Sequence, residues 1–225
     1  MAHKLPAIIL LAVLLALGAP LVVVAGDPDM LQDVCVADYH SLKGPLRLNG
    51  FPCKRHENVT ANDFFSGLLA KPGNTGNAAG SAVTAATVER LPGLNTLGVS
   101  LARIDFAPWG VNPPHTHPRA TEIIFVLHGS LRVGFITTAN SLFARTLRRG
   151  EVFVFPRGLV HFQKNNGRAP AAVVSAFNSQ LPGTQAVAQT LFGASPAVPT
   201  DVLARAFQID AGLVEAIESK FFPPM

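Results

Sequence analysis

The sequence predicts an all-β domain, either a sandwich or a barrel, followed by short helices. Between about residue 82 and residue 180, short apolar runs rich in β-branched and aromatic residues recur roughly every ten residues, with Gly, Pro and Asn between them. No helical period separates these runs, which argues against a fold of alternating strands and helices. The clearest runs cover 96–106, 122–127, 131–137, 152–155 and 171–177.

The pattern changes after Pro182. Apolar positions take on helical spacing, and we expect short helices over 186–192, 200–209 and 214–221. We therefore divide the chain into an N-terminal arm over 26–70, a barrel over 71–182 and a helical segment over 183–225 that makes oligomer contacts.

Residues 1–25 have the pattern of a cleaved secretory signal peptide. Lys4 precedes a charge-free apolar run that ends in Val23-Val24-Ala25, a small-residue cleavage pattern. The run is just long enough to span a bilayer, so a membrane anchor is the alternative, but two prolines and a glycine interrupt it. We therefore expect export, with no stable membrane insertion after cleavage.

The overall composition is that of a folded, charge-poor domain. Of the 225 residues, 48% are hydrophobic and 14% are charged, which excludes a disordered chain. The formal net charge is +4, yet no block of Lys or Arg occurs. This distribution argues against a nucleic-acid partner.

Two features of the arm suit an exported protein. Cys35 and Cys53 are the only cysteines, and such a pair favours one disulfide bond in an oxidising compartment. Two free buried thiols are the alternative, and zinc is disfavoured because no further Cys or His stands at metal spacing beside them. The only glycosylation sequon begins at Asn58, where we expect a glycan.

Three histidines and one glutamate have the spacing of a metal site. His115 and His117 are two residues apart, so on an extended strand both imidazoles point to one face. Glu122 follows after a proline, and His161 comes after turn-forming residues that could return the chain to the same place. Three imidazoles and a carboxylate suit Mn, Fe, Ni or Cu as well as Zn. Surface histidines are the alternative for an isolated His-x-His pair.

The residues around these four side chains form two boxes. The first is Asn112-Pro113-Pro114-His115-Thr116-His117, with Glu122 and Gly129 after it, and the second is Gly150, Pro156, Gly158, His161 and Asn165. Both boxes resemble those of the cupin superfamily, and specifically those of plant germins and germin-like proteins. Segments outside the boxes also resemble germins, namely residues 29–39, 95–100, 103–108 and 175–180.

This resemblance implies a cupin β jelly-roll barrel with short C-terminal helices and with manganese held inside the barrel. It implies a secreted protein of the extracellular space, in the apoplast or cell wall, that assembles as a trimer of dimers. It also implies the family's single disulfide, Cys35–Cys53. The metal ligands that it implies are His115, His117, Glu122 and His161.

One departure from the germin pattern narrows the expected activity. Germins oxidise oxalate with O₂, whereas germin-like proteins more often dismute superoxide, and two asparagines are implied to hold oxalate. One matches Asn112, but Ala102 occupies the other position and cannot donate a hydrogen bond to a carboxylate. Alternatively, Ala102 only fills a strand position and another residue supplies the donor.

We therefore expect a superoxide dismutase that produces hydrogen peroxide, with Asn112 as the catalytic residue that orients a bound oxygen species. Oxalate oxidase, with a small carboxylate as substrate, is the second hypothesis. A non-catalytic, metal-stabilised binding or receptor protein of the cell wall is the third.

A second departure concerns the start of the first box. Trp109 stands where the family usually has glycine, and Gly110 follows it. We expect only a local change in the loop. The Trp109 ring would lie either at the pocket mouth or in a packed position.

Overall fold

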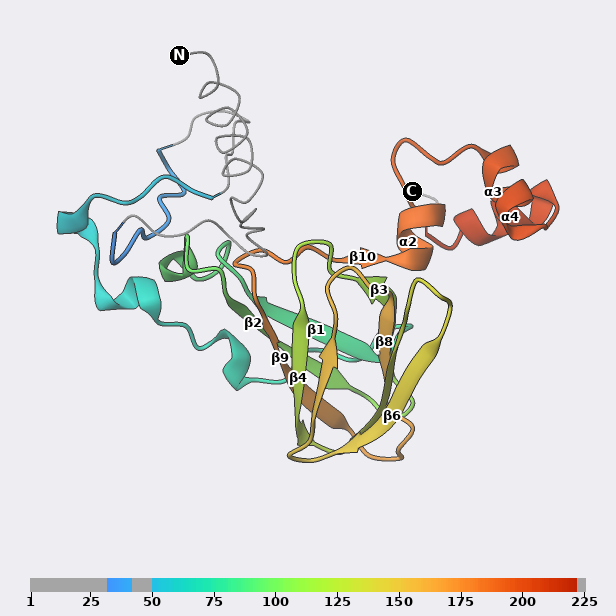
Figure 1. The fold of residues 1–225 in the computed structure, drawn as a ribbon, viewed down its shortest axis with the longest axis horizontal. Coiled ribbons are helices and arrows are strands. Elements are labelled where there is room, and N and C mark those ends of the chain that lie inside the picture. The colour runs from blue at the N-terminus through green and yellow to red at the C-terminus, as the bar shows by residue number, and fades with distance from the viewer. Residues whose placement is uncertain (1–31, 42–49, 222–225) are drawn as a thin grey trace, which may run out of the picture.

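The computed structural model describes residues 32–41 and 50–221, within which ten strands form two antiparallel sheets that face each other as a jelly roll (Figure 1). Across the first sheet, the strands are β1 Ser81–Ala86, β2 Ser100–Phe106, β9 Ala171–Phe177, β4 Glu122–His128 and β7 Val152–Phe155. Across the second sheet, they are β10 Gln185–Ala186, β3 Val111–Thr116, β8 His161–Lys164, β5 Ser130–Ile136 and β6 Leu142–Arg148. The predicted all-β class and jelly roll are confirmed.

Alternation along the strands explains how the sheets enclose a core. In β4, residues 122, 124 and 126 are buried while residues 123 and 125 are exposed, as in a strand with one face against the interior. The buried side chains of the core are mainly aliphatic: Ile104, Phe106, Ile124, Val126, Leu131, Val133, Leu147, Phe155, Ala171 and Val173.

The helices after the barrel largely match the predicted positions. They are α2 Val187–Phe192, α3 Thr200–Phe207 and α4 Ala211–Glu218, and four short 3-10 turns precede them in the arm and near β1: η1 His56–Asn58, η2 Ala61–Phe64, η3 Leu68–Ala70 and η4 Pro92–Leu94. The third predicted helix begins three residues earlier than expected. Its start is set by Asp210, whose carboxylate accepts a hydrogen bond from the Leu213 amide at 2.9 Å.

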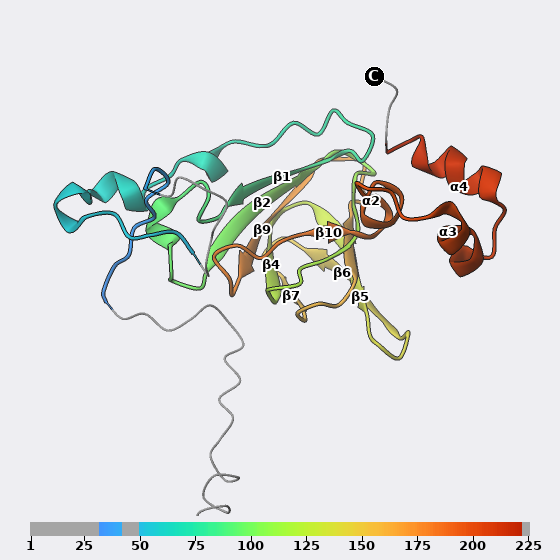
Figure 2. The same ribbon diagram turned by 90° about the horizontal axis from the view of Figure 1, so that it is seen from above.

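The helices lie beside the barrel (Figure 2), and their buried side chains form a small core of their own. Phe192 of α2, Leu203 of α3 and Val214 of α4 are buried against one another. Val202, Phe207 and Leu213 are exposed apolar residues of the same helices. The helical segment therefore leaves apolar surface exposed, although the Phe207 ring also contacts Phe192 of the small core, with 5.4 Å between centroids.

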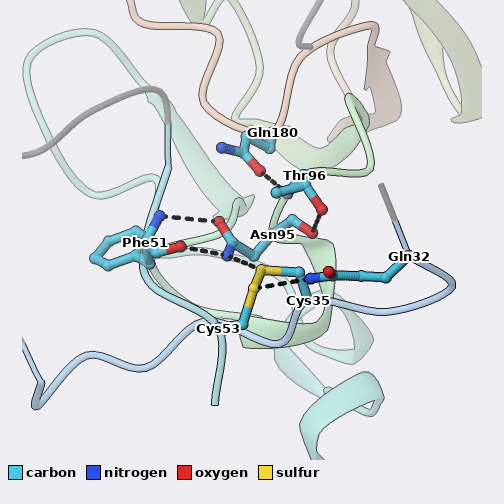
Figure 3. The surroundings of a disulfide bond; sticks show 7 residues. All are labelled: Gln32, Cys35, Phe51, Cys53, Asn95, Thr96 and Gln180. Carbon is cyan, nitrogen blue, oxygen red and sulfur yellow. Dashed lines mark hydrogen bonds between the residues drawn. A yellow bond between two sulfur atoms is a disulfide. The ribbon is translucent and has the colours of Figure 1, made fainter. Parts of the chain in front are cut away.

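The N-terminal arm is pinned to the barrel. Cys35 and Cys53 form the predicted disulfide bond (Figure 3). Asn95, fully buried beside it, donates from Nδ2 to the Phe51 carbonyl at 2.8 Å, and its Oδ1 accepts from the Phe51 amide at 3.1 Å. The side-chain amide of Asn95 thus makes two hydrogen bonds with the Phe51 backbone, as a neighbouring strand would. Asn58 of the sequon is exposed at the end of η1.

The predicted signal peptide of residues 1–25 lies outside the described residues. Within the described ranges, no helix is long and apolar enough to cross a membrane.

Candidate metal centre

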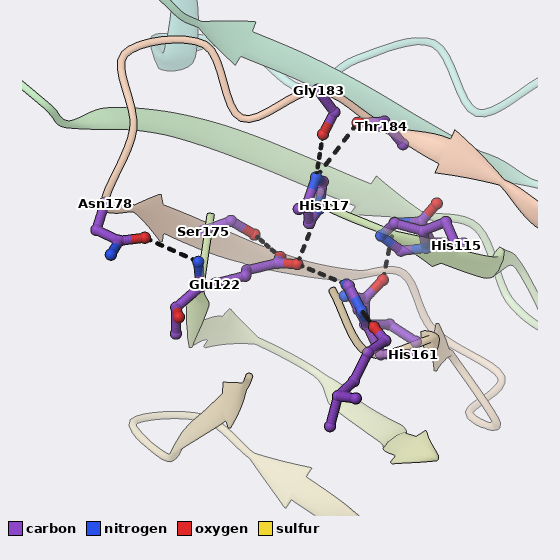
Figure 4. Close-up of polar contacts among 12 residues, drawn as sticks. His115, His117, Glu122, His161, Ser175, Asn178, Gly183 and Thr184 are labelled. Atoms are coloured by element: carbon purple, nitrogen blue, oxygen red, sulfur yellow. Dashed lines mark hydrogen bonds and ion pairs between the residues drawn. The ribbon is translucent and has the colours of Figure 1, made fainter. Parts of the chain in front are cut away.

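The structure gathers the four predicted side chains at one end of the barrel (Figure 4). His115 lies on β3 and His117 directly after it, while Glu122 and His161 are the first residues of β4 and β8. Because β3 pairs with β8, His115 stands opposite His161 in the ladder. One potential ligand atom from each residue lies within 4.8 Å of the others, and all four residues are buried.

The local sequence of β3 explains why both of its histidines reach the interior. The pairing of β3 with β8 shifts register between Asn112 and His115, where Pro113 and Pro114 stand. Proline has no amide hydrogen for a ladder bond, so prolines occur at such irregularities. Beyond them, His115 and His117 lie two residues apart on the buried face.

Backbone carbonyls orient all three imidazoles. The Nδ1 atoms lie 2.7 Å from the Pro113 oxygen for His115, 2.5 Å from the Gly183 oxygen for His117 and 2.8 Å from the Leu159 oxygen for His161. A carbonyl oxygen only accepts, so each Nδ1 carries the hydrogen, and a ring in its neutral form then presents the Nε2 lone pair to a metal ion. Metal-binding histidines are commonly held in this way.

Glu122 completes the cluster. Its Oε2 lies 2.9 Å from Nε2 of His161 and 3.2 Å from Nε2 of His117, and its Oε1 accepts a hydrogen bond from Ser175 Oγ at 2.7 Å. Lone pairs of nitrogen and oxygen thus converge in a buried space. Such an arrangement requires a cation between the atoms, either protons or a metal ion, and this donor set fits a metal.

The electrostatics favour the protonation states that bind metal. Burial, reinforced by the neighbouring His161, lowers the pKa of His115 to about 4. Burial would raise the pKa of Glu122, but hydrogen bonds with His117 and His161 outweigh it and hold that pKa at about 2. At neutral pH His115 is therefore uncharged and Glu122 is ionised, as a metal ligand must be.

Two polar residues of the site were not predicted from the sequence. Ser175 is the hydroxyl donor to Glu122, and Gln163 accepts a hydrogen bond at Oε1 from Asn112 Nδ2, 2.8 Å away. Gln163 is fully buried, and its Nε2 has no hydrogen-bond partner among the described residues. Because Gln163 follows His161 by two positions on β8, strand alternation was the signal that places it on the same face.

Ala102 lies beside the site on the inner face of β2, opposite Ser175 in the ladder with β9. It packs with Ala120 and Phe177, and the Phe177 ring meets His117 edge-on at 4.8 Å between centroids. This wall of the site is therefore apolar. Asn112 and Gln163, the amide side chains of the site, lie on the other sheet, where Asn112 donates its hydrogen bond to Gln163.

Trp109 occupies neither of its two expected places. It lies in the turn before β3, at the opposite end of that strand from His115 and His117, and the residue is 59% exposed. Its φ of 65° is in the left-handed region, which favours glycine. The backbone of this turn explains why glycine suits the position.

Comparisons with known proteins agree with this geometry. The Cupin family model matches residues 68–215. Germin-like protein 1-3 of Oryza sativa subsp. japonica is 77% identical over 200 residues, covering 89% of this chain and 90% of that protein. Nectarin-1 of Nicotiana plumbaginifolia is 67% identical over 199 residues, covering 88% of this chain and 85% of its own length.

A similar fold is found among solved structures. The structure of an oxalate oxidase in complex with the substrate analogue glycolate superposes with a TM-score of 0.83 at 50% sequence identity. The match covers 87% of this chain and 98% of that one.

Proposed function

The chain belongs to the cupin family as a germin-like protein, and from that premise we propose that it is a secreted, manganese-dependent oxidoreductase acting on a small oxygen species. The proposed ligands are His115, His117, Glu122 and His161. The observation that carries the proposal is the orientation of the three imidazoles, each held at Nδ1 by a backbone carbonyl, with Nε2 of His117 and His161 within 3.2 Å of the Glu122 carboxylate.

The ligand chemistry supports manganese over softer metals. The donor set is three imidazole nitrogens and one carboxylate oxygen, with no thiolate, because both cysteines of the chain form the disulfide in the arm. Such a set is borderline to hard and suits Mn, although Fe, Ni, Cu and Zn accept similar ligands. Metal analysis of protein purified without added metal decides among them.

Superoxide dismutation is the reaction that we propose for the site. A redox metal held by these four residues would carry electrons between superoxide ions, and two superoxide ions and two protons would give O₂ and H₂O₂. Asn112 and Gln163 provide amide groups that orient a small oxygen species. Ala102 and Phe177 form an apolar wall, which offers no hydrogen bond to a larger carboxylate.

Oxalate oxidation is the second candidate, and one observation favours it. The buried Nε2 of Gln163 has no partner among the described residues, so it is a donor available to a bound carboxylate. The oxalate oxidase structure at 50% identity points the same way. Gln163 would then supply the hydrogen bond that Ala102 cannot.

One sample tests both activities. Protein loaded with manganese is assayed for superoxide dismutation and for oxalate-dependent H₂O₂ formation. The proposal expects the first reaction and little of the second, whereas vigorous oxalate oxidation reverses the ranking. Absence of both reactions in a manganese-loaded sample would favour the third hypothesis, a metal-stabilised binding or receptor protein.

Two variants separate the hypotheses further. His161→Ala removes a ligand, so both metal content and activity should be lost; if both are retained, the assignment of the site is wrong. Ala102→Asn restores the donor of the germin pattern, and a gain of oxalate oxidation would show that this position selects the substrate. Ala120→Asn, in the same apolar wall but outside that pattern, is the control.

We also propose export and self-association. The disulfide bond and the exposed sequon at Asn58 suit an extracellular glycoprotein. The outer face of the first sheet carries exposed apolar side chains on three strands, namely Leu101, Ile123, Phe125, Val152 and Val154. Together with the C-terminal helices, this face supports a trimer of dimers.

The mass in solution tests the assembly. Phe125→Lys places a charge in the exposed apolar face and should lower the measured mass. Arg145→Lys, on the second sheet, is a control that should leave it unchanged. A wild-type monomer would overturn the proposal.

A further inference from the structure

The entrance to the metal centre lies at the end of the barrel where the four ligands gather. Along β4, the apolar core begins at Ile124, two residues beyond Glu122, and along β9 it ends at Val173, two residues before Ser175. The interior on that side is filled by buried side chains. A small molecule must therefore approach from the loops at the ligand end, which include the β3–β4, β5–β6, β7–β8 and β9–β10 connections.

Two of these loops carry an exposed arginine next to a ligand. Arg119 follows His117 by two residues, and Arg157 precedes His161 by four. Arg119 Nε donates to the Leu181 carbonyl at 2.7 Å, and Arg157 Nε donates to the Pro118 carbonyl at 3.0 Å. Each guanidinium is thus tied to the backbone through one nitrogen.

Arg119 has a second fixed neighbour. A Cβ at Gly183 would lie 2.7 Å from a terminal nitrogen of Arg119, so the guanidinium rests against this glycine. The Gly183 carbonyl is the group that orients His117. The Arg119 guanidinium therefore lies at the rim of the centre, against Gly183, the residue whose carbonyl orients the proposed ligand His117.

Both charges are available to a ligand. Arginine is protonated at all physiological pH values, and neither arginine takes part in any of the ion pairs found among the described residues. Their Nε contacts are to neutral carbonyls, which leave the positive charge uncompensated. Two positive charges held beside the loops at the ligand end raise the local concentration of anions.

We propose that Arg119 and Arg157 form a cationic entrance that attracts small anions, either superoxide or a small carboxylate, to the metal centre. The inference rests on the proposed function only in that the substrate is anionic. The two arginines would thus recognise the substrate by their charge, without contacting the metal ion or its ligands.

Anion binding to the manganese-loaded protein tests the entrance without relying on turnover. Azide and oxalate binding are measured through the relaxation of water protons, at about 0.01 M and about 1 M of a weakly coordinating salt, where the screening length is about 30 Å and about 3 Å. In Arg119→Gln/Arg157→Gln, affinity at low salt should fall about tenfold or more, with a larger loss for the dianion. The salt dependence seen in the wild type should nearly vanish.

A matched control separates position from net charge. Arg148→Gln/Arg168→Gln removes the same charge at the opposite end of the barrel, where β6 ends and the β8–β9 loop lies. It should bind anions as the wild type does. Equal losses in the two double variants, or no loss in either, would overturn the proposal.

A charge-preserving variant guards against a merely structural effect. Arg119→Lys/Arg157→Lys keeps both charges and loses the guanidinium geometry, so it should retain most anion binding and its salt dependence. If it instead loses as much as the glutamine variant, charge is not the cause and the proposal fails. Salt-dependent anion binding without turnover would refute the proposed activity while leaving the entrance intact.

Discussion

The two ends of the barrel interior are built from the same strands but are stabilised by different interactions. On β4, Glu122 belongs to the ligand end, while Ile124 and Val126, on the same face, belong to the core. The core end needs only apolar contact, which burial itself stabilises. The ligand end buries charge and polar groups, which is costly unless each has a partner. Backbone carbonyls and Ser175 supply those partners, and a metal ion would complete them.

Acid should affect the ligand end most. In the folded chain the pKa of His115 is lowered from 6.5 to about 4 and that of Glu122 from 4.5 to about 2, so the unfolded chain binds more protons across this range. The free energy of unfolding of the metal-free protein should therefore fall as the pH drops from about 6.5 to about 2, and bound metal should be released.

Denaturant titrations at several pH values, with metal analysis, measure this loss. His115→Gln removes one titrating group and should flatten the dependence between about pH 6.5 and pH 4. A metal-free wild type whose stability is constant over that interval would contradict the account of the ligand end.

The core end should respond to a cavity and not to metal. Ile124→Ala removes a fully buried side chain and should lower the free energy of unfolding by about 2–5 kcal/mol. Metal affinity measured below the unfolding transition should be unchanged. Ile136→Ala, at a residue that is 38% exposed, is the control and should cost much less. Loss of metal in Ile124→Ala would mean that the two ends are coupled.

A smaller effect is expected where a hydrogen bond supports a ligand. Ser175→Ala deletes the donor to Glu122 and should weaken metal binding by about 10–100-fold, because such supporting contacts orient the ligand. Ser100→Ala removes a buried hydroxyl that donates to the Ser179 carbonyl and should leave the metal affinity unchanged. Competition with a chelator measures both affinities, and equal losses would assign Ser175 a general packing role.

The smallest effect lies in the turn before β3, away from the ligands. Trp109→Gly removes the strain of a non-glycine residue in the left-handed region and should raise the free energy of unfolding by about 1 kcal/mol. We expect this gain because the strain removed exceeds the cost of glycine's greater conformational entropy in the unfolded chain. Asn140→Gly is the control, because asparagine tolerates its φ of 59° better. A destabilised Trp109→Gly protein with unchanged metal content would show that the exposed indole makes contacts that outweigh the strain.

Strand prediction succeeded for four of the apolar runs and located only part of the other strands. The runs at 122–127, 131–137, 152–155 and 171–177 became β4, β5, β7 and β9 with ends that move by one residue at most. The run at 96–106 yields β2 only from Ser100, because Thr96 and Gly98 have positive φ and form a turn. The predicted runs did not include β1, β3, β6, β8 or β10. Two prolines hide the pairing of β3, and β8 has only four residues.

The sequence by itself determined the class of fold, the disulfide pair and the four side chains that the structure brings together. Their types and spacing are local properties, since a two-residue repeat places His115 and His117 on one face. The tertiary structure alone decided which nitrogen each imidazole presents, that Gln163 stands beside Asn112, and that Arg119 and Arg157 flank the entrance. The carbonyls that hold His115 and His161 lie only two residues away along the chain. The other arrangements depend on contacts between strands and loops that are distant along the chain, so no local sequence pattern encodes them.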